Sequence, residues 1–301
     1  AVLPKLAAWR RDFHAHPEAG WTEFRTAALI IRRLRELGYA IRMGEAACAS
    51  DRRMGVPSSA VLAAARERAL EHGADAELVA GMGDGYTGFW ADLDCGPGPV
   101  TAFRFDMDCN EVAECAEESH RPVREGFASR WPGLMHACGH DGHAAVGLGL
   151  AEVLVSIRRH LRGRIRLIFQ PAEEGARGAL PMSEAGAVDG VDVLFGFHIG
   201  FKAEGPGSLI CGTQGFLATT KRDVLFSGVP AHAGAAPEEG KDALLAACSA
   251  VVNLHAISRN GKGGTRIAVG RLEGGEARNV IPASARLFME TRGETTELDA
   301  Y

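Results

Sequence analysis

The feature that most limits the fold is an order of apolar segments in which strand-like runs alternate with a helix. Val100–Phe105 and Arg164–Phe169 are short apolar runs with strand character. Between them, Ala144–Ile157 is apolar at nearly every position and is long enough for a buried helix. Val191–Phe197 predicts a further strand, which ends at His198. This order predicts an α/β fold with a mostly parallel sheet flanked by helices.

Polar residues follow each of these predicted strands at its end. Asp106 and Asp108 follow the first strand, Glu173 and Glu174 follow the second, and His198 follows the third. Ligand sites in open α/β sheets lie beyond the carboxyl ends of the strands. The alternate spacing of the two aspartates places them on one face if the strand continues through them. The sequence therefore predicts that its metal-type side chains converge at one edge of the sheet.

The densest group of candidate ligands is the stretch HACGHDGH, residues 136–143, directly before the apolar helix. Thiolate, imidazole and carboxylate groups within eight residues are typical of a metal site. An alternative is a loop whose His and Asp side chains cap the helix. Both interpretations can hold for different members of the stretch.

The Glu173–Glu174 pair suits two different roles. Neighbouring carboxylates project in different directions, so one can bind a cation while the other faces a water molecule. The alternative for this pair is a solvated acidic turn. For His198, the alternative is a buried histidine whose hydrogen bonds are satisfied within the core.

The rest of the chain predicts two further helices and a second domain. Amphipathic spacing predicts helices over Glu23–Leu37, which Gly38 terminates, and over Ser58–His72. After the Gly-rich stretch 205–215 the pattern changes, which predicts a catalytic domain over 1–215 and a smaller α+β domain over 216–301. The elements expected in the smaller domain are strands at Ala218–Ser227, Arg266–Arg271 and Ser284–Thr291 and a helix at Asp242–Ile257.

Composition excludes several other classes of protein. The 301 residues are 46% apolar, and the net charge of −5 comes from 33 basic and 38 acidic side chains that are mixed along the chain. This charge pattern favours neither nucleic acid nor an anionic membrane surface, and no apolar run reaches the ~18 residues of a membrane span. The seven cysteines are too sparse for a disulfide framework and predict reduced thiols in the cytoplasm.

Six stretches resemble, in order, the motifs of M20 family metal-dependent amidohydrolases. Together with SHRP and REGFAS, they are most similar to the group of that family that hydrolyses p-aminobenzoyl-glutamate. The resemblance implies a zinc-exopeptidase-like catalytic domain with an inserted α+β lid or dimerisation domain. The stretches are RRDFHAHPEAG, FRFDMDCNE, MHACGHDGH, IRLIFQPAEEGARGAL, FGFHIG and GVPAHAGAAPEEGKDALLA.

The resemblance assigns roles in the site residue by residue. It implies two divalent ions, Mn²⁺ or Zn²⁺, and Glu173 as the general base that takes a proton from water. Asp106 and Asp108 suit the role of orienting a metal-bound histidine. The implied metal ligands are Cys138, His140, Glu174 and His198.

Three residues of the smaller domain are also implied to act. His232 would reach the site of a neighbouring protomer, where it would stabilise the oxyanion, and Asn279 and Arg292 would hold the substrate carboxylate. The implied assembly is a homodimer or a heteromer with a related subunit. The alternatives are a surface turn for His232, a turn before the following strand for Asn279, and a solvated cation at a strand end for Arg292.

The implied reaction is hydrolysis of the amide bond of an N-acyl or N-aroyl amino acid. p-Aminobenzoyl-glutamate is the first candidate, followed by other N-acyl amino acids and small dipeptides. A noncatalytic binding or assembly subunit remains open. So does a structural metal domain built on Cys138 and His140, although closed zinc sites usually pair two half-sites rich in Cys or His.

Two departures from the family pattern concern the site. The family's Asp-x-Asp strand end is usually followed closely by Pro, whereas Cys109 and Asn110 follow Asp108 here, so we expect a different loop geometry. The family's last metal ligand is a His from a C-terminal return of the catalytic domain, beyond Tyr301. We therefore expect a fragment or an incomplete site.

Overall fold

The computed structural model describes residues 2–200, 205, 207–212 and 214–301. The chain divides into two compact units, Ala1–Glu204 and Gly205–Tyr301. This division falls earlier than the boundary at 215/216 expected from the sequence. The described residues between 205 and 217 contain neither helix nor strand, so the first regular element of the second unit begins at Ala218.

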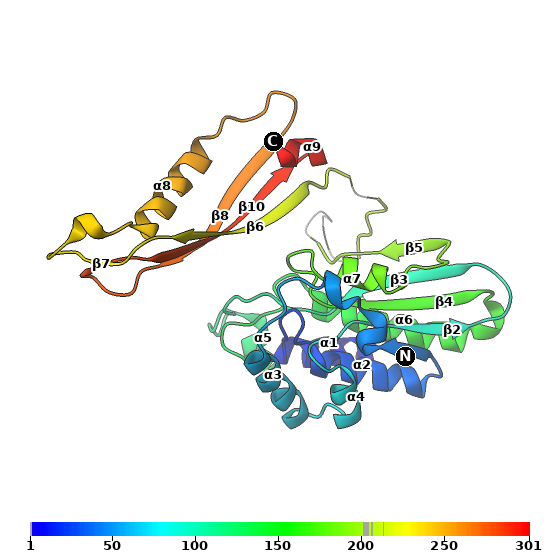
Figure 1. Cartoon of the computed structure of the whole chain (residues 1–301). Helices are drawn as coiled ribbons and strands as arrows, with labels where there is room; N and C mark the ends of the chain where they lie inside the picture. Colours follow the sequence, from blue (N-terminus) through cyan, green and yellow to red (C-terminus); the bar gives the residue numbers. More distant parts are fainter. Residues whose placement is uncertain (1, 201–204, 206, 213) are drawn as a thin grey trace. The chain divides into compact units, whose positions relative to one another are not determined.

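The first unit is built on a five-stranded sheet in the order β1-β2-β4-β3-β5 (Figure 1). Strands β4, β3 and β5 pair in parallel, whereas β2 is antiparallel to both of its neighbours. The expectation of a mostly parallel sheet is therefore confirmed, with β2 as the one reversed strand of this sheet. The strands are β1 (Ala40–Met43), β2 (Phe89–Asp94), β3 (Val100–Asp106), β4 (Arg164–Gln170) and β5 (Val193–Gly196).

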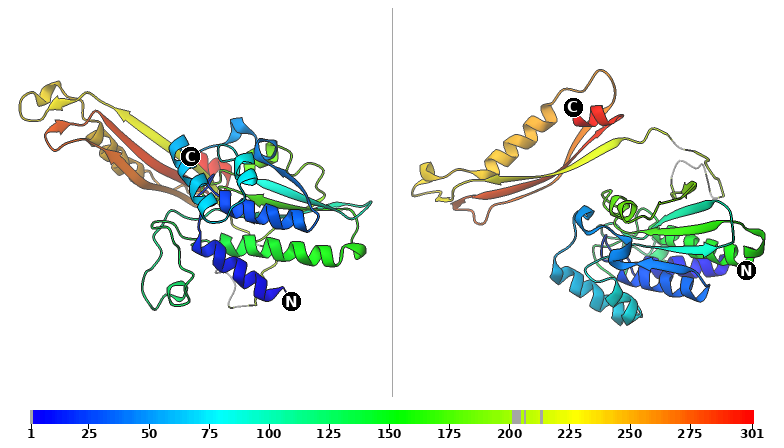
Figure 2. Two further views of the ribbon diagram at one scale, coloured as in Figure 1. Left: turned by 90° about the horizontal axis from the view of Figure 1, so that it is seen from below. Right: turned by 45° about the vertical axis from the view of Figure 1, so that its right-hand side comes forward.

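Three long helices pack against one another beside this sheet, and α6 contacts β3 and β4 (Figures 1 and 2). They are α1 (Leu3–Ala15), α2 (Phe24–Glu36) and α6 (His140–Ser156). The core between helices and sheet includes Phe24, Phe105 and Phe169, each at most 2% exposed. The shorter helices are α3 (Ser59–Glu71), α4 (Ala76–Gly81), α5 (Arg121–Arg124) and α7 (Ala179–Glu184), with single 3₁₀ turns η1 (Gly44–Ala47), η2 (Ser50–Arg52) and η3 (Arg158–His160).

Local sequence signals account for most helix ends. Helix α2 ends before Gly38, whose φ of 84° lies in the left-handed region that glycine adopts freely. Ser58 caps α3 by accepting a hydrogen bond from the Val61 N–H. Helix α6 begins at His140 and not at Ala144, so half of the HACGHDGH stretch is helical. Gly139 makes this early start feasible because its φ of 80° turns the chain directly into the helix.

Two strands of the sheet were not predicted. β1 is only four residues long and alternates between exposed and half-buried positions, which gives too few periods for a pattern. β2 pairs with both β1 and β4, and most of its side chains are buried. None of the described helices has the length and apolar character needed to cross a membrane.

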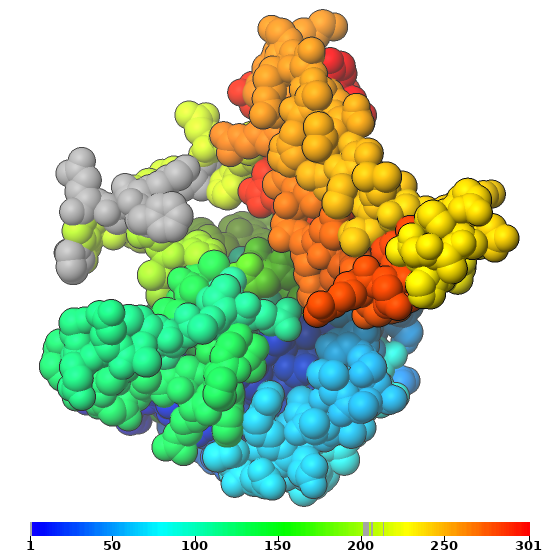
Figure 3. Space-filling model, turned by 90° about the vertical axis from the view of Figure 1, so that its left-hand side faces the viewer, coloured from blue at the N-terminus to red at the C-terminus, as the bar shows by residue number. Residues whose placement is uncertain are grey.

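The second unit contains a three-stranded antiparallel sheet, β6-β10-β8, with helix α8 against it. Ala243 and Ala247 of α8 pack on Ala285 and Leu287 of the sheet. Leu245, on the same helix, is exposed; Figure 3 shows α8 in gold on the surface of this unit. The elements are β6 (Ala218–Ser227), β7 (Ala231–His232), η4 (Pro237–Glu239), α8 (Ala243–Ala256), β8 (Thr265–Gly274), β9 (Val280–Ile281), β10 (Ser284–Gly293) and α9 (Thr296–Ala300).

A buried histidine links three distant parts of the first unit. His14 Nδ1 lies 2.8 Å from Asp141 of α6, and its Nε2 lies 2.9 Å from Glu114 in the segment before α5. Burial lowers the pKa of His14, but the hydrogen bonds to Asp141 and Glu114 outweigh burial and raise it above 6.5. His14 therefore carries a proton that joins α1, α6 and the intervening segment.

We predict that His14→Ala lowers the free energy of unfolding by about 3 kcal/mol, because it removes one partner of a buried ion pair. The protonated imidazole contributes its full stability below pH 6.5, and this contribution is lost as pH rises through the higher folded-state pKa. Urea unfolding of both proteins between pH 6 and 9 measures the effect. The stability difference should shrink as pH rises, and a difference independent of pH contradicts the prediction.

The control is His160→Ala, because His160 is exposed in η3. This variant should stay within about 0.5 kcal/mol of wild type, as surface substitutions usually do.

Candidate metal centre

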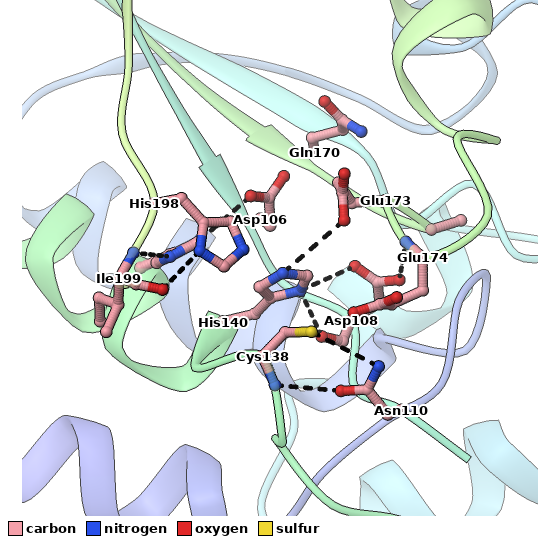
Figure 4. Close-up of polar contacts among 12 residues, drawn as sticks. Asp106, Asp108, Asn110, Cys138, His140, Gln170, Glu173, Glu174, His198 and Ile199 are labelled. Atoms are coloured by element: carbon pink, nitrogen blue, oxygen red, sulfur yellow. Dashed lines mark hydrogen bonds and ion pairs between the residues drawn. The ribbon is translucent and has the colours of Figure 1, made fainter. Parts of the chain in front are cut away.

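Three of the four predicted metal ligands converge in the first unit (Figure 4). Cys138, His140 and Glu174 each place a potential ligand atom within 4.8 Å of those of the other two. Cys138 lies just before α6, His140 is its first residue, and Glu174 follows β4. The parallel pairing of β3 with β4, and the contact of α6 with both, bring these sequence-distant residues to one edge of the sheet.

The donor atoms of this group fit a divalent cation. His140 Nε2 and Glu174 Oε1 are buried without a hydrogen-bond partner among the described residues. Buried polar atoms without a partner cost free energy unless something binds them. A thiolate, an imidazole nitrogen and a carboxylate oxygen together form a donor set that suits zinc and similar transition metals.

The electrostatics of the two strongest donors are consistent with this interpretation. Burial raises the pKa of the Cys138 thiol to about 11, and the Glu174 carboxylate raises it further. Burial lowers the pKa of His140, but the hydrogen bond and charge of Asp108 prevail and raise it to about 9. Both side chains therefore retain a proton at neutral pH, and a cation that binds them must displace it.

Asp108 orients two of the three ligands. Its backbone carbonyl accepts a hydrogen bond from His140 Nδ1 at 2.8 Å, and its Oδ2 accepts one from the Glu174 N–H at 2.9 Å. Because Nδ1 is held by the carbonyl, Nε2 is the nitrogen that remains for a cation. This geometry supports the orienting role predicted for Asp108.

Asp106 acts through His143, a residue that the sequence analysis quoted but gave no role. Asp106 Oδ2 lies 3.1 Å from His143 Nδ1 and 2.9 Å from Arg104, and it is fully buried. His143 Nε2 accepts a hydrogen bond from the Ile199 N–H at 3.0 Å. Both ring nitrogens are therefore occupied, which suits a positioning role although Asp106, His140 and His143 also converge. The spacing of the two histidines, three residues apart on one helix face, was the available signal.

His198 lies beside the ligand group but outside the three converging donors. Its ring centre is 5.6 Å from that of His140 and 4.6 Å from that of His143. His198 Nδ1 lies 2.5 Å from the Ile199 carbonyl oxygen, so Nε2 is the free nitrogen. Gly142 lets the segment after β5 approach α6, because a Cβ there would lie 2.4 Å from Ile199 Cδ1.

Glu173 lies next to the ligands and makes no hydrogen bond among the described residues that would fix its carboxylate. Its oxygens lie 3.8 Å from His140 Nε2 and 3.8 Å from Arg104. Burial raises the pKa of Glu173, the nearby Asp106 charge raises it further, and Arg104 opposes both. A half-buried carboxylate with a raised pKa is suited to accept and return a proton.

In the second unit, His232 and Asn279 lie next to each other. β7 pairs with β9 so that His232 faces Val280, and the Ala233 N–H donates to the Asn279 carbonyl at 3.0 Å. His232 Nδ1 accepts two backbone N–H groups, from Gly234 and Ala235, at 3.1 Å each. Its proton is therefore on Nε2, which makes the exposed edge of the ring a hydrogen-bond donor.

Arg292 is not grouped with these two residues. It lies near the end of β10, whereas β9 ends just before this strand begins at Ser284. Eight residues of strand separate Ser284 from Arg292, which corresponds to about 26 Å. Arg292 Nε donates to Glu290 at 2.6 Å, so its cation is already paired within the unit.

The sequence of residues 102–280 matches the description Peptidase family M20/M25/M40. The chain belongs to this family. The predicted membership and its hydrolase class are confirmed, and a bound divalent metal is consistent with both the family and the donor geometry.

Two sequence relatives share half of their aligned residues with this chain. Indole-3-acetyl-aspartic acid hydrolase of Enterobacter agglomerans is 50% identical over 100% of this chain and 69% of its own length. One of the named subunits of p-aminobenzoyl-glutamate hydrolase, from Escherichia coli (strain K12), is 50% identical with the same coverage.

Two solved structures share the fold of this member of the family. The aminobenzoyl-glutamate utilization protein from Klebsiella pneumoniae has a TM-score of 0.82 and 45% identity, over 100% of this chain and 69% of that one. The Bacillus subtilis YXEP protein, described as a dinuclear metal binding peptidase from the M20 family, has a TM-score of 0.58 and 29% identity, over 98% of this chain and 65% of that one.

We predict that His143→Ala weakens binding of Zn²⁺ or Mn²⁺ by about tenfold, the lower end of the range for residues that orient metal ligands. The substitution removes the group that joins Asp106 to the Ile199 backbone. Calorimetric titration of the purified protein measures the affinity. His143→Gln retains an acceptor for Ile199 and should lose less affinity, and wild-type affinity in His143→Ala contradicts the prediction.

Proposed function

We propose that this protein hydrolyses the amide bond of an acidic amino acid that carries an aromatic N-acyl group. The supporting observation is the group formed by Cys138, His140 and Glu174, with Glu173 next to it. The set combines donors for cations with a carboxylate free to move a proton. Such a combination serves hydrolysis better than it serves a closed structural metal site.

In the proposed reaction, two divalent cations, Mn²⁺ or Zn²⁺, supply the positive charge that polarises the amide carbonyl and makes water more acidic. His198 joins the three converged ligands. Glu173 takes a proton from the attacking water and returns it to the leaving amine. The raised pKa of Glu173 favours both transfers, because proton transfer is most efficient when the pKa of the group is near the working pH.

The proposed substrate class follows from what the two relatives have in common. Their names specify an indole-3-acetyl group on aspartic acid and a p-aminobenzoyl group on glutamate. Each substrate joins an aromatic acyl group to an acidic amino acid through one amide bond. We take p-aminobenzoyl-glutamate, cleaved to p-aminobenzoate and glutamate, as the first substrate to test for this chain.

We also propose that the protein acts as a homodimer or together with a related subunit. The Escherichia coli relative is named as one subunit of its hydrolase, which supports an assembly. In a neighbouring protomer, the Nε2–H of His232 would donate to the oxyanion of the tetrahedral intermediate. Asn279 would hold the substrate carboxylate near it, and Arg292 would do so after leaving Glu290.

A cytoplasmic location is part of the proposal. All seven cysteines are free, and two of them, Cys48 and Cys109, are buried. Unpaired thiols in this number are more common in a reducing compartment than in secreted proteins.

We predict that the protein releases glutamate from p-aminobenzoyl-glutamate when Mn²⁺ or Zn²⁺ is added, and that a chelator abolishes the release. Indole-3-acetyl-aspartate tested in parallel, with enzymatic detection of the released amino acid, distinguishes the two acyl groups. N-acetyl-glutamate, which lacks the aromatic ring, should be hydrolysed more slowly. Bound metal without turnover of any of the three substrates favours a noncatalytic subunit.

We predict that Glu173→Ala lowers kcat by at least about 100-fold, because general acid–base catalysis typically contributes that much or more. The variant should bind metal as tightly as wild type, since the three converged donors remain. Glu184→Ala, an exposed position on α7, is the control and should retain wild-type kcat. A Glu173→Ala protein with nearly full turnover would remove the assigned role.

A further inference from the structure

The loop after β3, where the chain departs from the family pattern, reaches the third ligand through Asn110. The Asn110 N–H donates to the Met135 carbonyl at 3.0 Å, and the Met135 N–H donates to the Asn110 carbonyl at 3.1 Å. This single antiparallel bridge ties the end of the strand to the segment that leads into Cys138. Asn110 is therefore fixed through its backbone before its side chain makes any contact.

The Asn110 side chain contacts Cys138 at two points (Figure 4). Its Oδ1 accepts the Cys138 N–H at 3.1 Å, and its Nδ2 lies 3.7 Å from Cys138 Sγ. A backbone N–H can only donate, so the amide oxygen must face it and the NH₂ group must face the sulfur. The orientation of the amide is thus determined by the backbone.

A donor aimed at the sulfur is useful only if the sulfur bears negative charge. A neutral thiol accepts hydrogen bonds weakly, whereas a thiolate accepts them well. The Glu174 carboxylate on the other side of Cys138 repels a thiolate, and the Asn110 NH₂ group opposes that repulsion. A purely structural turn residue at this position would need no donor directed at the sulfur.

We propose that Asn110 is a positioning residue for the Cys138 ligand, holding its backbone and donating a hydrogen bond to its thiolate in the metal-bound state. The inference rests on the proposed function, in which Cys138 binds a metal. It extends to Cys138 what Asp108 does for His140 and Glu174. The three residues from Asp108 to Asn110 would then orient all three converged ligands.

Cobalt(II) is the probe, because a thiolate bound to it gives a charge-transfer absorption band. The near-isosteric Asn110→Leu variant removes both contacts to Cys138. We expect about tenfold weaker cobalt binding, as for other residues that orient metal ligands. We also expect the band to move to lower energy, because a thiolate without a hydrogen bond releases electron density more readily. Asn253→Leu, at an exposed position on α8, is the control and should leave both measurements unchanged.

Hydrogen exchange of the Cys138 amide in the metal-free protein tests the clamp independently. Asn110→Leu should lose protection there, whereas Asn110→Asp retains the acceptor oxygen and should preserve it. Wild-type band energy and affinity in Asn110→Leu would overturn the proposal, as would equal loss of amide protection in Asn110→Leu and Asn110→Asp. A wild-type protein that gives no thiolate band would instead contradict the metal centre of the proposed function.

Discussion

The end of strand β3 is the constraint on which the site depends. Its parallel pairing with β4 brings Asp108 to the Glu174 backbone, and the contact of β3 with α6 brings the Asp108 carbonyl to His140. Both hydrogen bonds use groups whose positions the sheet fixes before any metal binds. The donors are therefore largely preorganised, which lowers the entropy lost when a cation orders them.

Several buried charges at this edge balance one another only in part. Asp106 is fully buried, yet Arg104 and His143 both contact it. One oxygen each of Asp106 and Asp108, together with His140 Nε2, has no hydrogen-bond partner in the part of the chain that the structure describes. A buried carboxylate is stabilised by nearby positive charge, so this edge favours a cation over empty space.

The second unit contributes donors of a different kind. Two backbone N–H groups fix the tautomer of His232, so the ring presents Nε2–H without having to change its protonation state. A neutral donor of this type stabilises developing negative charge and leaves the proton inventory of the reaction to Glu173. The pairing of β7 with β9 supplies this geometry from residues almost fifty positions apart.

The sequence by itself determined the element types, the family and the chemistry of the ligands, because apolar periodicity and the HACGHDGH stretch are local features. It did not determine the start of α6, which depends on the left-handed conformation of Gly139. Nor did it assign the bridge from His143 to Asp106, 37 residues away, or the contact of Asn110 with Cys138, 28 residues away. Only the tertiary structure decided these, because a side chain's partner across such distances is set by strand pairing and helix packing and not by its neighbours in the chain.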